Sequence, residues 1–200
     1  NNYGIRKNLL DYDQVMNEQR EIIYAERRRV LDGESMRDVI YKMITDIVEN
    51  SVNMCIGDDE SSDSWDVVEL TRVLCSVVPV RPIMPQMVQG MKKNELLHQL
   101  KEEAVKLYES KEAEFPNSEA IREVERVILL KVIDRKWMTH IDDMDQLRQG
   151  IGLAVYGGRD PIVEYKMNAY DMFDAMTENI KEDTVRLLLT VRVEQKMERE

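Results

Sequence analysis

The residues of this 200-residue chain that could bind a metal ion are few and widely spaced. It has two histidines, His98 and His140, and its two cysteines, Cys55 and Cys75, lack the CxxC spacing of a metal site. His140 and Asp143 in WMTHIDDMD could share one face of a helix. Two ligands from one helical turn do not complete a zinc site, so we expect no metal and interpret His140 as a surface or interhelical residue.

Motifs for nucleotide chemistry or acid–base catalysis are also missing. No glycine-rich phosphate loop followed by Lys-Ser or Lys-Thr occurs, so we expect no nucleotide or other cofactor in these residues. Paired carboxylates such as Asp58-Asp59 and Asp142-Asp143 are typical of solvated surface charge. The chain by itself is therefore not expected to be an enzyme.

Composition excludes further classes of protein. The net charge of −11 disfavours nucleic acid as a partner, and 34% charged with only 6% aromatic residues favours long, exposed helices. No run of about 18 apolar residues and no signal peptide is visible. The sparse cysteines favour a reducing, cytosolic environment. The chain starts at Asn1 without an initiator Met, and no helix cap precedes its first periodic segment, so we expect a piece of a longer protein.

The first element is predicted to be a helix over about residues 3–31. Apolar residues recur every seven positions, at Leu9, Met16, Ile23 and Val30. The complementary heptad position carries Ile5 and Tyr12 and then turns polar at Gln19 and Glu26. A helix with one narrow apolar seam forms no core alone, so other helices must pack along it. Asp32-Gly33 is expected to end it.

The middle of the chain has a different texture, with short helices between acidic and proline-rich loops. The expected elements are a helix capped by Ser35 and ending near Glu49, a polar loop over 56–64, a short helix over about 65–77, a proline-rich segment over 79–85 and a helix over about 94–115. Pro116-Asn117-Ser118 is expected to stop this last helix and cap the next one. The 13 methionines are interpreted mainly as core residues, with a flexible surface for varied partners as the alternative.

The last part of the chain carries the strongest helical pattern. Apolar residues follow steps of three and four from Ile121 to Val155 and again from Ile162 to Val191, with Pro161 in the first turn of the second helix. Helices of about 35 and 30 residues form a hairpin about 45–55 Å long. Trp137 lies on the seam and is predicted to be buried against the first helix. No strand pattern occurs, so the fold class is all-α.

The bend of this hairpin is the most distinctive candidate site. VYGGRDP (155–161) combines two helix-breaking glycines and a proline with Tyr156 and Arg159. A tyrosine ring gains about 0.5–1.5 kcal/mol beyond its buried area against aromatic groups, and its hydroxyl can meet a peptide backbone. Tyr156 is therefore suited to contact polypeptide of almost any sequence. The alternative is that it only closes the hairpin against its own helices.

Three segments resemble the SecA preprotein translocase motor family. NYGIRKNLLDYDQVMNEQREIIY (2–24) is similar to the start of its helical scaffold domain. VILLKVIDRKWMTHIDDMDQLRQGIGL (127–153) and YGGRDPIVEYKMNAYDMFDAM (156–176) are similar to its two-helix finger. The resemblance implies a long scaffold helix over 1–32, a smaller helical wing domain inserted over 33–117, and a two-helix finger over 118–200 with its tip near 154–160.

The resemblance implies partners that the residues alone do not. In the family, the finger enters the SecYEG channel and its tip meets unfolded preprotein. The scaffold packs against nucleotide-binding and preprotein cross-linking domains of the same parent chain, and those nucleotide-binding domains hold ATP and Mg. A homodimer of the parent and a place at the cytoplasmic face of the bacterial plasma membrane are also implied. The competing hypothesis is a structural coiled-coil interaction module without a motor role.

Site residues follow from the same resemblance. Tyr156 matches the tip tyrosine of the family, and the channel- and preprotein-contacting set around it is Ala154, Val155, Gly157, Gly158 and Arg159. Members often read RAYGQ there, so this chain lacks a basic residue at Ala154 and an amide at Gly158. Arg6 in GIRK matches an arginine at the scaffold–motor junction that restrains the ATPase. A solvated arginine with an acidic neighbour is the alternative for Arg6.

Overall fold

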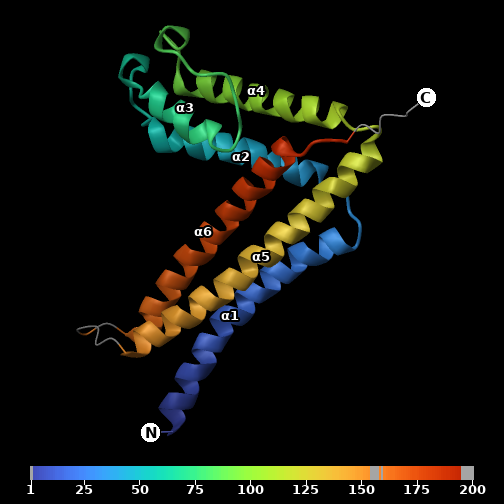
Figure 1. Ribbon diagram of the computed structural model, residues 1–200. Helices are drawn as coiled ribbons and strands as arrows, with labels where there is room; N and C mark the ends of the chain where they lie inside the picture. The colour runs from blue at the N-terminus through green and yellow to red at the C-terminus, as the bar shows by residue number, and fades with distance from the viewer. Residues whose placement is uncertain (1, 154–157, 159, 195–200) are drawn as a thin grey trace. The chain divides into compact units, whose positions relative to one another are not determined.

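The computed structural model describes residues 2–153, 158 and 160–194, which form helices joined by loops, with no strand among them (Figure 1). The α-helices are α1 (Asn2–Leu31), α2 (Arg37–Cys55), α3 (Val67–Cys75), α4 (Lys93–Ala113), α5 (Ser118–Leu153) and α6 (Pro161–Thr190). Two short 3-10 turns, η1 (Ser62–Ser64) and η2 (Pro85–Met87), lie in the loops of the middle section. The all-α prediction is confirmed. None of the described helices is long and apolar enough to cross a membrane.

The chain forms two compact units. The first unit contains Asn1–Glu34 and Leu129–Ile180, and the second contains Ser35–Ile128 and Lys181–Glu200. Most of α5 and most of α6 therefore belong with α1, whereas the start of α5 and the end of α6 belong with α2, α3 and α4. The division into 1–32, 33–117 and 118–200 stays a prediction.

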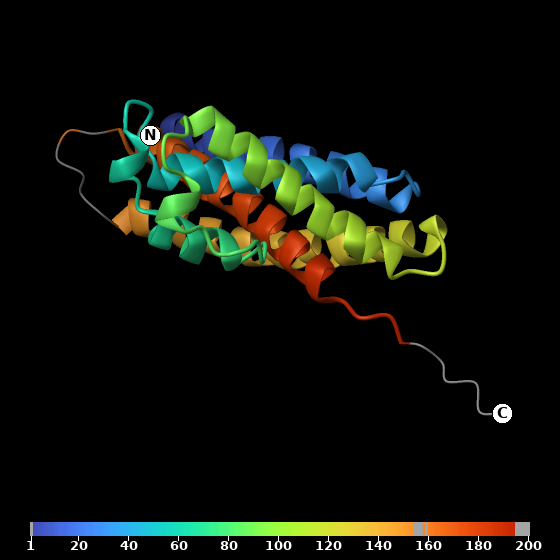
Figure 2. The ribbon, with the colours of Figure 1, turned by 90° about the horizontal axis from the view of Figure 1, so that it is seen from above.

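In the first unit, α1 packs along the hairpin made by α5 and α6 (Figures 1 and 2). Four buried residues of the hairpin form the core cluster, Met144, Ile151, Tyr165 and Ala169. Tyr12, Val15 and Met16 of α1 pack against that cluster. Because residues on both sides of the bend share this cluster, the two helices of the hairpin run back along each other.

The predicted apolar seam of α1 is buried only over part of its length. Ile23 and Val30 are buried and Met16 is partly buried against the hairpin, but Leu9 is 47% exposed. The heptad pattern therefore marks one face of α1 correctly without telling how far the hairpin covers it. Gly33 has a φ of +80° directly after the helix, which confirms the predicted stop at Asp32-Gly33.

In the second unit, α2 and α4 each bury one stripe of residues spaced four apart. The stripe of α2 is Ile40, Ile44, Val48 and Val52, and that of α4 is Leu96, Leu100, Ala104 and Tyr108. The two helices contact each other. Helix α2 also contacts α3, whose buried residues include Leu70 and Leu74. Residues four apart form a ridge on a helix surface, and such ridges pack into the grooves of a neighbour.

Both predicted ends of α2 are wrong. The helix begins at Arg37 after Met36, and Ser35 Oγ only accepts a bond of 3.4 Å from the Arg37 N–H. It continues past Glu49 to Cys55 because Ser51 and Val52 are buried, and the Ser51 hydroxyl donates to the Ile47 carbonyl at 2.8 Å. Burial in the second unit therefore overrides the polar sequence of this last turn.

Candidate functional site

The hairpin bend, residues 154–160, joins the end of α5 to the start of α6. Of the predicted bend residues, Ala154, Val155, Tyr156, Gly157 and Arg159 lie outside the described residues. Gly158 is described as an exposed turn residue with a φ of +82°. A side chain at that position is strained even though open space surrounds it, which gives a backbone reason for glycine there.

The start of α6 is fixed by local hydrogen bonds. The Asp160 carboxylate accepts from the Ile162 N–H at 3.1 Å, and the Asp160 carbonyl accepts from Val163 N–H at 3.1 Å. Pro161 is the first helical residue, as predicted, because a proline at that position lacks only an N–H that would have no partner within the helix. The bend therefore ends at a defined residue.

Exposed apolar side chains flank the bend on both helices, and sequence reasoning missed them. Leu153 at the end of α5 is 87% exposed, and Val163 and Met167 near the start of α6 are also exposed. These residues lie off the seam of three and four steps that the hairpin buries. They could have been found from the sequence, because an apolar residue that lies outside the apolar stripe of a helix is expected to be exposed.

Arg6 lies near the start of α1 with an exposed side chain. Its position fits both the interdomain role that the family resemblance implies and the alternative of a solvated arginine.

Two ion pairs tie α1 to α5 within the first unit. The Arg27 guanidinium donates to both carboxylate oxygens of Asp134, with the shorter contact at 2.8 Å. Towards the bend, Arg148 pairs with Asp13 at 3.2 Å and lies over the Tyr12 ring, 5.1 Å from its centroid. Both pairs are partly exposed, so each is expected to add little to the stability of the first unit.

A buried polar cluster lies between these two ion pairs. The Nε2 atom of His140 is 2.7 Å from Oε1 of Gln19, and the Gln19 amide nitrogen donates to the Ala169 carbonyl oxygen at 3.1 Å. His140 is 3% exposed, between the rings of Trp137 and Phe173. Burial lowers the pKa of His140, although the charge of Asp143 acts in the opposite direction.

This geometry decides how His140 is to be understood. Its Nε2 atom is engaged by Gln19, and Asp143 is exposed, so the interhelical interpretation is confirmed. Among the residues that the structure describes, no three His, Cys, Asp or Glu side chains are grouped closely enough to hold a metal ion.

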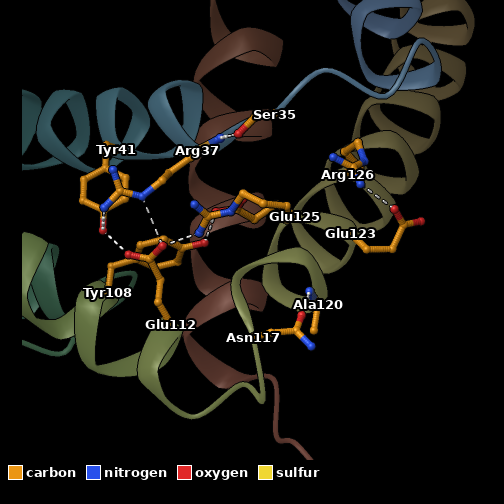
Figure 3. Close-up of polar contacts among 11 residues, drawn as sticks. Ser35, Arg37, Tyr41, Tyr108, Glu112, Asn117, Ala120, Glu123, Glu125 and Arg126 are labelled. Atoms are coloured by element: carbon orange, nitrogen blue, oxygen red, sulfur yellow. Dashed lines mark hydrogen bonds and ion pairs between the residues drawn. The ribbon is translucent and has the colours of Figure 1, made fainter.

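A second polar cluster joins α2, α4 and α5 in the second unit (Figure 3). Glu125 is fully buried, accepts from the Tyr108 hydroxyl and pairs with Arg122 Nε at 2.7 Å. Arg122 also pairs with Glu112, which accepts further bonds from Arg37 and Tyr41. The cluster therefore links one carboxylate buried deep in the core to a second one nearer the surface.

The two carboxylates of this cluster have opposite shifts. Burial raises the pKa of Glu125, whereas for Glu112 burial is outweighed by hydrogen bonds from Tyr41, Arg122 and Arg37, which lower its pKa. Such a divided pair resembles acid–base machinery. Structural ion-pair networks produce the same shifts, and we interpret this cluster as structural.

The family model described as "SecA Wing and Scaffold domain" matches residues 1–192. The chain belongs to this SecA wing and scaffold family. A protein translocase subunit SecA of Lachnoclostridium phytofermentans is 64% identical, over 100% of this chain and 24% of the relative. Another SecA subunit, of Syntrophomonas wolfei, is 45% identical over 98% of this chain and 24% of its own length. The chain thus spans about a quarter of these SecA relatives.

The sequence of this SecA wing and scaffold chain predicted the hairpin and its bend, but neither of the two buried polar clusters was predicted. Gln19 was visible only as a polar interruption of the heptads. Glu125 could have been found, because Ile121 and Leu129, four residues away on either side, are buried on the same helical face.

Proposed function

We propose that this chain is the scaffold and wing part of an ATP-driven preprotein translocase, with the bend of the α5–α6 hairpin contacting preprotein. The observation that carries the proposal is the family match over residues 1–192 together with translocase as the name of the SecA relatives. The hairpin also supports it. Helix α1 packs against the core cluster of the α5–α6 hairpin, and the sequence places Tyr156 in the bend of that hairpin.

The rest of the machinery is proposed to lie outside these 200 residues. ATP and Mg are bound by nucleotide-binding domains of the parent chain, and the scaffold helix α1 packs against them and against the preprotein cross-linking domain. The parent associates peripherally with the cytoplasmic face of the plasma membrane through the SecYEG channel, either as a monomer or as a homodimer. Arg6, exposed on α1, contacts the motor domains and restrains their ATPase.

The chemistry proposed for the bend is contact without sequence preference. The ring of Tyr156 supplies apolar area and a hydroxyl for the backbone of the preprotein. Leu153, Val163 and Met167 extend that apolar surface onto the flanking helices, because their side chains are exposed next to the bend. Apolar contact is non-directional, which suits a substrate whose sequence changes as it passes.

A site-specific cross-link tests this proposal. A photo-reactive amino acid replaces Tyr156 in the full-length parent, and translocation into inner-membrane vesicles is arrested by a folded domain at the end of the preprotein. We expect an ATP-dependent cross-link between position 156 and the arrested chain. The matched control is the same probe at Val68, an exposed apolar residue of α3 in the second unit, where no cross-link is expected. Equal yields at both positions, or none at 156, would contradict the proposal.

A further inference from the structure

Gln19 and His140 are the buried polar side chains among the described residues of the first unit. They interrupt a seam whose other members are apolar, including Met16 and Ile23 on α1 and Met144 on α5. Gln19 reaches both helices of the hairpin at once, through His140 on α5 and the Ala169 carbonyl on α6. The three helices therefore meet at one amide group.

The chemistry of the three groups allows only one arrangement. The Ala169 carbonyl only accepts hydrogen bonds, so it must face the amide nitrogen of Gln19. The amide oxygen then faces His140, and because it too only accepts, His140 must carry a proton on Nε2. The neutral Nε2–H form of the ring meets this requirement. Each polar atom of Gln19 is thus used by a different helix.

A polar group in such a place acts differently from its apolar neighbours. Apolar contact is non-directional, so the rest of the seam tolerates small shifts of α1 along the hairpin. A shift by one residue moves a helix by about 1.5 Å and breaks both bonds of Gln19, which leaves buried polar groups without partners. In coiled coils a single buried amide in the seam selects one register and lowers stability.

We propose that Gln19 and His140 are positioning residues that set the register between α1 and the α5–α6 hairpin. The pair allows one alignment among the several that the apolar seam would accept, so the hairpin follows α1 as one body within the first unit. This inference depends on the seam alone and not on the proposed translocation function. It assigns the pair to alignment and not to stability.

Distance measurements in the full-length parent test the register. Paramagnetic labels are attached to unnatural amino acids at Glu21 of α1 and Asp171 of α6, both exposed positions of the first unit. The parent without further changes is expected to give one narrow distance distribution. The double variant Gln19→Met/His140→Leu removes both polar groups together. We expect it to melt at or above the temperature of the unmodified parent while its distance distribution at least doubles in width or splits in two.

Two further variants make the outcome unambiguous. The control Gln14→Met changes an exposed glutamine of the same helix whose amide donates to Glu18 within α1, and its distribution should stay narrow. A folded double variant with the same single narrow distance as the unmodified parent would overturn the proposal. If neither this double variant nor the swapped Gln19→Leu/His140→Met folds, the pair serves stability and the proposal is likewise wrong.

Discussion

Trp137 of α5 meets Tyr24 of α1 edge-on, with their ring centroids 6.5 Å apart and their planes at 70°. Trp137 is 5% exposed, so its predicted burial against the first helix is confirmed. Its indole N–H has no hydrogen-bond partner in the described structure. The tryptophan therefore contributes to the first unit through ring area and not through its polar atom.

Replacing this ring gives a first prediction. Trp137→Ala should lower the free energy of unfolding by about 3–5 kcal/mol, as for other large core truncations. Trp137→Phe should cost less, because it keeps most of the area and removes the unpartnered N–H. Chemical denaturation followed by circular dichroism measures both. The control is Met138→Ala, at a neighbouring residue that is 68% exposed, and its free energy of unfolding should change by no more than about 0.5 kcal/mol. If Trp137→Ala lost no more stability than this control, the account would be contradicted.

The pKa of His140 gives a second prediction, on pH. Burial lowers this pKa in the folded state below the unfolded value of about 6.5, so below that pH the unfolded chain binds the extra proton first. The stability that the folded chain gains from keeping His140 neutral is fully present above about pH 7, and it is lost as the pH falls through the range below 6.5. The slope for one proton is at most about 1.4 kcal/mol per pH unit.

The measurement is the free energy of unfolding from pH 8 to pH 5 for the unmodified chain and for His140→Gln. Every residue other than 140 is the same in both chains, so the remaining pH dependence cancels in the difference. We expect the unmodified chain to lose more stability on acidification than the variant does. Parallel curves would mean that His140 is accessible to protons in the folded state.

The buried ion pair of the second unit gives a third prediction. Arg122→Met leaves the fully buried Glu125 without its cation and removes one partner of Glu112, and this should cost about 3–5 kcal/mol. Unfolding can be followed by the fluorescence of Trp65, which lies in the same unit. The matched control is Arg72→Met, whose pair with Glu69 on α3 is exposed and should be worth about 0–1 kcal/mol. Similar losses in the two variants would argue against a structural role for the cluster.

A fourth prediction concerns nucleotide. The sequence lacks a phosphate loop, so titration of ATP and Mg into residues 1–200 alone should give no binding heat. The positive control is the full-length parent, which should bind ATP in the same buffer. A dissociation constant tighter than about 1 mM for the 200-residue chain would contradict the placement of the nucleotide site elsewhere.

Periodic apolar residues made the long elements predictable. The heptads of α1 placed it within one residue of its observed span, and Pro161 marked the start of α6. The ends of α2 were not predictable, because burial of Ser51 against the second unit's core carries no signal in its local sequence. Gln19 and His140 are 121 residues apart, so their pairing depends on the register of two helices, which periodicity leaves open.

The central claim, that the hairpin bend contacts moving polypeptide through Tyr156, is tested most directly by vesicle translocation with the full-length parent. Tyr156→Ala should reduce the rate of preprotein import strongly, and Tyr156→Ser should reduce it as well. Tyr156→Phe should retain most of the rate. The melting temperature should change little, as for surface substitutions. Basal ATPase activity should persist because no nucleotide motif lies in these residues. If Tyr156→Ala imports preprotein as fast as the unmodified motor, the bend only closes the hairpin and the claim is wrong.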